Sequence, residues 1–191
     1  MQTNIKINIY DLLNHLEKRR AMYLGNEYTF QSLDAFLTGF SISADKTQYI
    51  SDMYNDFSDF NIWLLGHLPK HFGQSGGWHW QISNRNQNDD ENAFKEFFEF
   101  VKVFKSSKKN VEQIKIKPFE FKKTEFNIET KTEIEKQEII DSIHKITLEN
   151  SKTIWLKGYH KKKLTYNQWC LSKEAFADML DNLDKGINNT F

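Results

Sequence analysis

Hydrophobic positions in the first half of the chain recur with the period of an α-helix. Leu12, Leu13 and Leu16 mark one face of a predicted helix over residues 8–22, which the turn at Gly25 ends. Thr29 caps a second predicted helix, and a third spans residues 47–65. The strongest pattern follows Asp89 and Asp90, because carboxylates suit a helix N-terminus. The apolar stripes of the second and fourth helices are Leu33, Phe36, Leu37 and Phe40, and then Phe94, Phe97, Phe98, Val101 and Phe104.

The second half alternates apolar and polar residues more often. Residues 78–82 already alternate in this way, which predicts a short strand between the third and fourth helices. Residues 114–122 alternate on both sides of Pro118, as expected of an edge strand. Four isoleucines favour a fifth helix that starts near Thr132. Two further strands, 153–157 and 166–170, are joined through residues 160–163, and Ser172 caps a last helix. The four isoleucines are Ile139, Ile140, Ile143 and Ile146.

These elements predict an α+β fold that is mostly helical, with an N-terminal helical part, a small antiparallel sheet and a C-terminal helix. Lysine becomes frequent from residue 105 onward, which favours a helical core part over 1–105 and a C-terminal α/β part over 106–191 packed on it. One continuous domain is the alternative. With 191 residues, of which 15% are aromatic, the chain can bury a sizeable core.

Charge and cysteine content narrow the function. The chain has 26 Lys and Arg residues and 26 Asp and Glu residues, so its formal net charge is zero. Proteins that bind nucleic acid are usually basic, and nucleic acid is therefore not the expected partner. The lone Cys170 fits a reducing compartment. Residues 1–6 lack the apolar run of a signal peptide, and the apolar stretch 60–68 is too short to span a bilayer. We therefore expect a cytoplasmic protein without a membrane partner.

No motif in the sequence predicts a metal, a cofactor or a catalytic centre. His67 and His71 have the spacing of a helical zinc pair, but Pro69 lies between them and disrupts a helix. The glycine-rich residues 73–77 lack the Lys-Ser or Lys-Thr ending of a phosphate loop. Cys170 is expected to be a small buried residue within a strand. We therefore expect no cofactor, no metal and no enzymatic activity.

A site assembled from residues distant in sequence is the enzymatic alternative. His79, Arg85 and Glu91 are the candidates for it, since active sites need not be local in sequence.

Acidic residues gather on the third predicted helix and beside it. Asp52, Asp56 and Asp59 stand at i, i+4 and i+7 and so share one helix face. Residues 41–100 contain nine acidic and four basic residues, and such a surface speeds association with a basic partner. The face is either a solvated surface or a partner contact. In the second case Glu91 belongs to the contact, and Trp78 is its buried anchor, since tryptophan dominates interface energies.

A basic segment, residues 102–123, offers a different function. Its lysines, with Phe119 and Phe121 among them, suit contact with nucleic-acid phosphates. Because the net charge is zero, a solvated sheet edge is the competing interpretation. A nucleic-acid-binding accessory protein is therefore the alternative function.

The first 105 residues contain several short segments that belong together: residues 20–25, Leu33, residues 36–40, Trp63, Gly77-Trp78, Ala93-Phe94 and Phe97-Phe98. These segments resemble bacterial immunity-type proteins, which are encoded beside polymorphic toxins such as contact-dependent inhibition toxins. The resemblance implies a cytoplasmic protein that binds a cognate toxin domain and covers or distorts its active site. A basic nuclease toxin would complement the acidic face.

Overall fold

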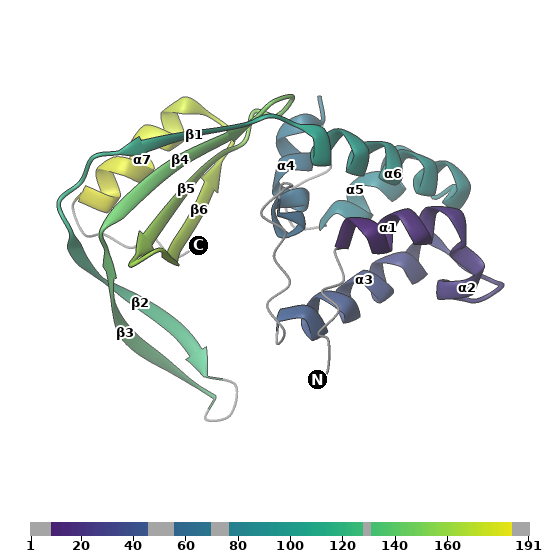
Figure 1. The fold of residues 1–191 in the computed structure, drawn as a ribbon, viewed down its shortest axis with the longest axis horizontal. Coiled ribbons are helices and arrows are strands. Elements are labelled where there is room, and N and C mark those ends of the chain that lie inside the picture. The colour runs from purple at the N-terminus through teal and green to yellow at the C-terminus, as the bar shows by residue number, and fades with distance from the viewer. Residues whose placement is uncertain (1–8, 46–55, 70–76, 128–130, 185–191) are drawn as a thin grey trace, which may run out of the picture. The chain divides into compact units, whose positions relative to one another are not determined.

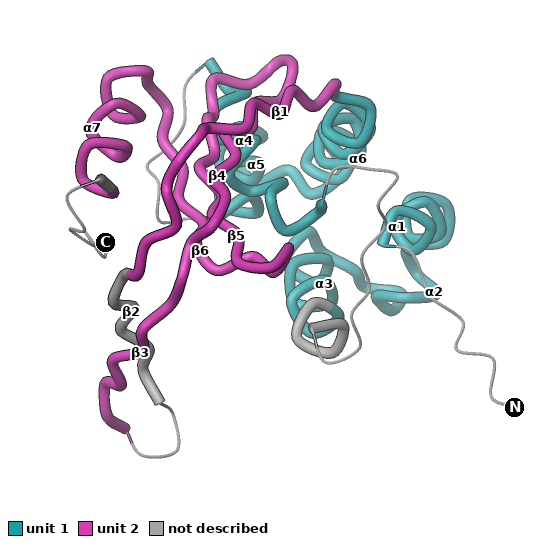
Figure 2. Tube along the Cα trace, turned by 60° about the vertical axis from the view of Figure 1, so that its left-hand side comes forward, with its two compact units in different colours: residues 1–107 teal, residues 108–191 magenta. Residues whose placement is uncertain are grey.

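The computed structural model describes residues 9–45, 56–69, 77–127 and 131–184. The chain divides into two compact units, Met1–Ser107 and Lys108–Phe191, which Figure 2 distinguishes by colour. The first unit is helical in its described part. The described residues of the second unit form six strands and one helix (Figure 1).

Unit 1 buries a continuous set of aromatic rings. Phe97 on α6 packs against Phe60 on α4 with ring centroids 5.7 Å apart, and Phe30 on α3 lies 5.4 Å from Phe94. All four side chains are fully buried or nearly so. The helices are α1 (Ile9–Lys18), α2 (Arg20–Leu24), α3 (Phe30–Asp45), the 3-10 turn η1 (Phe57–Asp59), α4 (Phe60–His67), α5 (Gly77–Arg85) and α6 (Asp90–Ser106).

The structure confirms some of the helices and strands predicted for unit 1 and contradicts others. Asp89 caps α6 as predicted, because its carboxylate accepts a hydrogen bond from the backbone N–H of Asn92 at 3.1 Å. The helix predicted over 8–22 is divided into α1 and α2 at Arg19. The strand predicted over 78–82 is wrong, since these residues belong to α5. Part of the helix predicted over 47–65 lies outside the described residues, and its last part forms η1 and α4.

Unit 2 is built on antiparallel strands. Four of them form one sheet in the order β1-β4-β5-β6, and β2 pairs with β3 in a second, two-stranded sheet. Helix α7 (Lys173–Asp184) lies on one face of the four-stranded sheet (Figure 1) and begins after Ser172, whose hydroxyl accepts from the Ala175 N–H at 3.1 Å. The strands are β1 (Lys109–Ile114), β2 (Phe119–Asn127), β3 (Thr132–Ile140), β4 (Ser142–Leu148), β5 (Ile154–His160) and β6 (Lys163–Cys170).

The prediction of a mostly helical fold with a small sheet is wrong. The C-terminal half is rich in strands, and the fifth helix predicted from Thr132 is replaced by β3 and β4. Strands predicted over 153–157 and 166–170 are confirmed in β5 and β6. The edge strand predicted over 114–122 is interrupted at Pro118, where β1 has ended and β2 is about to begin.

The two sheets of unit 2 are successive parts of one long hairpin. The β1–β4 ladder ends where Ile114 faces Ile143, and the β2–β3 ladder begins where Phe119 faces Ile140. Four residues on one strand therefore stand opposite two on the other, and such a bulge bends a ribbon. Beyond this bend, β2 and β3 extend away from the four-stranded sheet (Figure 1).

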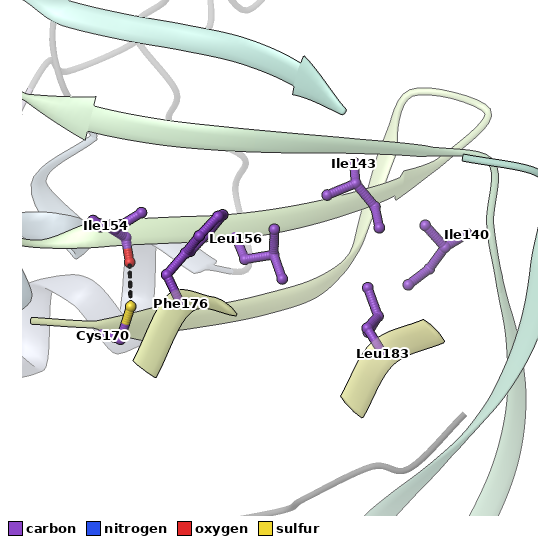
Figure 3. Packing of buried hydrophobic residues seen from close by; sticks show 7 residues of the cluster. All are labelled: Ile140, Ile143, Ile154, Leu156, Cys170, Phe176 and Leu183. Atoms are coloured by element: carbon purple, nitrogen blue, oxygen red, sulfur yellow. Dashed lines mark hydrogen bonds between the residues drawn. The ribbon is translucent and has the colours of Figure 1, made fainter. Parts of the chain in front are cut away.

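The core of unit 2 lies between α7 and the sheet. Figure 3 shows isoleucine and leucine side chains from β3, β4 and β5 gathered opposite Phe176 and Leu183 of α7. Gly158 of β5 lies beside this core, and a Cβ atom there would stand 3.0 Å from both Ile140 Cδ1 and Tyr166 Cβ. The buried members of the cluster are Ile140, Ile143, Ile154, Leu156, Cys170, Phe176 and Leu183.

Candidate partner-binding surfaces

Two members of the predicted acidic face lie together at the start of α4. Asp56 is exposed and caps η1, accepting a hydrogen bond from the Ser58 N–H at 3.0 Å. Asp59, half-buried, is the last residue before α4. Burial, and then the carboxylates of Asp56 and Asp59, raise the pKa of the Tyr10 phenol above its usual value. Asp52, the third member of the face, lies outside the described residues.

Glu91 is occupied by a contact inside unit 1. Both of its carboxylate oxygens accept from Arg20 Nη1, at 3.1 and 3.0 Å. The guanidinium of Arg20 also lies over the Phe94 ring at 4.7 Å, a cation–π geometry. Next to Glu91, Asp90 accepts from the Phe30 N–H at 3.1 Å, at the first residue of α3. The acidic start of α6 therefore connects this helix to α2 and α3.

Trp78 belongs to the aromatic packing of unit 1. Its ring centroid is 4.6 Å from that of Phe97 and 5.6 Å from that of Phe30. The side chain is half-buried. The structure therefore places the predicted anchor with one part of its ring against the core and the other part accessible.

The basic segment 102–123 is divided between the two units. Lys102 on α6 pairs with Glu17 at 2.6 Å, and Lys105 lies 5.3 Å from the centroid of the Tyr10 ring. Both lysines thus contact other parts of unit 1. From residue 108 onward the segment belongs to unit 2, where Lys108, Lys109, Lys115 and Lys117 are exposed.

No protein-family model, no curated protein and no solved structure matches this chain.

The candidate catalytic residues each contact a different group. His79 stacks on Phe30 with centroids 5.0 Å apart, Arg85 pairs with Glu96 at 3.0 Å, and Glu91 pairs with Arg20. The structure does not bring His79, Arg85 and Glu91 together around a shared point.

The candidate metal ligand His67 and the candidate nucleophile Cys170 also pack against other residues. His67 stacks on Trp63 at 4.4 Å, and His71 lies outside the described residues. Among the described residues no group of three His, Cys, Asp or Glu side chains has the geometry to hold a metal ion. Cys170 Sγ is buried and lies 3.4 Å from the Ser172 carbonyl oxygen, and burial raises the pKa of this thiol.

In the described part of the chain, no helix is both long and apolar enough to cross a membrane.

Residues 160–163, which the sequence predicts only as a connection between two strands, include a basic turn in unit 2. Lys161 and Lys162 connect β5 to β6 with φ angles of 48° and 68°, a left-handed conformation that residues other than glycine rarely adopt. Asp141 holds this turn. Its Oδ2 atom accepts from the Lys161 N–H at 2.8 Å and lies 3.2 Å from His160 Nδ1. The Lys161 N–H, followed by Ser142 and His160, lowers the pKa of the Asp141 carboxyl.

An exposed apolar surface adjoins the basic turn. Leu164 is 44% exposed and Ile139 is 37% exposed. The Thr165 hydroxyl donates to the Ile139 carbonyl at 3.4 Å, which brings the end of β3 beside the start of β6. Large apolar side chains at an exposed position next to charged ones are typical of a protein-binding surface. The sequence carried one signal for this surface, the run of three lysines between two predicted strands.

Proposed function

We propose that this chain is a binding protein that neutralises a bacterial toxin by covering the toxin's active site. The observation that carries the proposal is the β2–β3 ribbon. The side chains of residues 132–139 on β3 are exposed, except that Glu138 is half-buried, and they include Ile134 and Ile139 at 37% exposure each. A two-stranded ribbon is only marginally stable by itself, and its open edges can accept another strand. Side chains alternate between the two faces of a strand, so a partner protein packed on the face that carries Ile134 would bury that isoleucine.

The resemblance of residues 1–105 to immunity-type proteins suggests that the partner is a bacterial toxin domain. Immunity proteins are encoded beside their toxins, so the product of the adjacent gene is the partner to test. Covering an active site requires an extended contact surface, and a ribbon with nine residues in each strand supplies one.

The test is a binding and inhibition experiment with that toxin. We expect a complex in calorimetry and loss of toxin activity when the chain is added. Ile134→Lys should weaken binding by at least tenfold, because it places a charge in the apolar part of the contact. Val111→Lys is the matched control: Val111 is 50% exposed on β1, outside the ribbon, and this variant should bind normally. A toxin that forms no complex would refute the proposal.

A further inference from the structure

The charge of the chain is divided unevenly between its units. Residues 1–107 contain ten basic and thirteen acidic residues, whereas residues 108–191 contain sixteen lysines and thirteen acidic residues. Unit 2 is therefore net positive although the whole chain is neutral. Its lysines are consecutive at residues 161–163, and all three are exposed.

The conformation of the basic turn indicates that its lysines serve a purpose beyond connecting two strands. A two-residue hairpin of this kind favours Asn-Gly, because both positions need a positive φ. Lys161 and Lys162 adopt that conformation although a residue with a Cβ atom is strained in it. Among the described residues no carboxylate pairs with the ammonium groups of Lys161, Lys162 or Lys163. Asp141 accepts from the backbone of the turn and leaves these ammonium groups to solvent.

The neighbours of the turn indicate what kind of partner it meets. Ile139 and Leu164 are exposed beside it, and they would gain from burial against a protein surface. A phosphate backbone has no comparable apolar surface for them to contact. Charged residues around apolar ones are the usual arrangement of a protein interface, with the charges at its rim.

We propose that Lys161, Lys162 and Lys163, together with Ile139 and Leu164, bind an acidic surface of the partner protein. This inference rests on the proposed function and adds the sign of the charge that unit 2 contacts. Lysines at the rim act mainly on the rate of association, which falls as salt screens the charges.

The test compares two double variants for association with the toxin from the adjacent gene, by stopped-flow at low and high salt. Lys161→Asn with Lys162→Gly removes two charges and supplies the residues that the turn conformation favours. We expect association on the order of tenfold slower at low salt, with the difference shrinking at high salt. Lys152→Gln with Lys173→Gln removes two exposed lysines elsewhere in unit 2 and should leave the rate unchanged.

Each outcome bears on a different part of the inference. Thermal unfolding should show the Asn-Gly variant to be at least as stable as the wild type, which separates lost charge from lost structure. Equal association rates for the two double variants would overturn the acidic-surface assignment and leave the proposed function standing. A toxin that does not bind at all would overturn both. Binding of a labelled RNA or DNA oligonucleotide that depends on Lys161 and Lys162 would assign the turn to nucleic acid and overturn the protein assignment.

Discussion

Replacing Gly158 by alanine tests the packing that joins the base of the ribbon to the sheet. The added Cβ would lie 3.0 Å from Ile140 Cδ1 and from Tyr166 Cβ, whereas carbon atoms in good contact are about 3.5–4.0 Å apart. Tyr166 Cβ is fixed to the backbone of β6, and Ile140 has 0% exposure, so neither atom has free space to move into.

Two effects of opposite sign decide the result. Alanine restricts the unfolded chain and so stabilises by about 0.4–1 kcal/mol, while overpacking a core costs about 1–3 kcal/mol. Steric crowding wins here because one of the crowded atoms is next to the backbone. Subtracting the smaller effect, we expect Gly158→Ala to lower the free energy of unfolding of unit 2 by about 1–2 kcal/mol.

Native-state hydrogen exchange, resolved by peptide, measures this difference separately for each unit. Amides of β5 and β6 should exchange about tenfold faster in Gly158→Ala than in the wild type. Gly39→Ala is the matched control, because Gly39 lies within α3 and a Cβ there meets no atom within 4 Å. This substitution should slow exchange in α3, since glycine inside a helix costs about 0.5–1 kcal/mol relative to alanine. Unchanged or slower exchange of β5 in Gly158→Ala would refute the steric argument.

Three further predictions follow from buried or paired groups. Folding lowers the pKa of the Asp141 carboxyl, so the ionised carboxylate stabilises the folded state above the unfolded-state pKa of about 3.9. This stabilisation is lost as the pH falls through the lower pKa of the folded state. The difference in melting temperature between wild type and Asp141→Asn should therefore be clear at pH 6 and vanish in strong acid. Because burial raises the pKa of the Cys170 thiol, maleimide should label it slowly in native protein at pH 8 and rapidly in guanidinium. Phe97→Ala should cost unit 1 about 3–5 kcal/mol in chemical denaturation, since the ring is fully buried among four other aromatic rings.

Helix α6 could be predicted because its signals are local. A capping aspartate, acidic residues in the first turn and apolar residues at helical spacing all lie within one short segment. The strand predicted over 78–82 failed although a helical pattern was also present there. Trp78, Gln81 and Ile82 stand at i, i+3 and i+4 and turn toward the interior, while Trp80 is 41% exposed. The alternation of large and polar residues overlaps with this pattern and favours a strand, although the burial of these residues follows the helical spacing.

The isoleucines of β3 and β4 were misread for a different physical reason. Ile140 and Ile143 enter the same core although they are three residues apart, a spacing that regular strands exclude. The bulge at Asp141 and Ser142 shifts the alternation by one residue and makes this possible. Ile146 then pairs with Trp155, on the opposite face from Ile143. A spacing of three residues, repeated twice, has the appearance of a helix, and only the pairing between strands reveals the difference.

Contacts between distant residues limit what a count of carboxylates says about a partner surface. The sequence shows how many carboxylates a segment carries, but not what each one contacts. Asp56 and Asp89 cap helical turns, Asp90 binds the start of α3, and Glu91 pairs with Arg20, 71 positions earlier in the chain. Helix N-termini attract acidic residues for their own stability, so a helical unit accumulates carboxylates that already have partners. Lysines in a strained turn have no such local explanation. For this reason the exposed lysines of unit 2 are a stronger indication of partner charge than the acidic residues of unit 1.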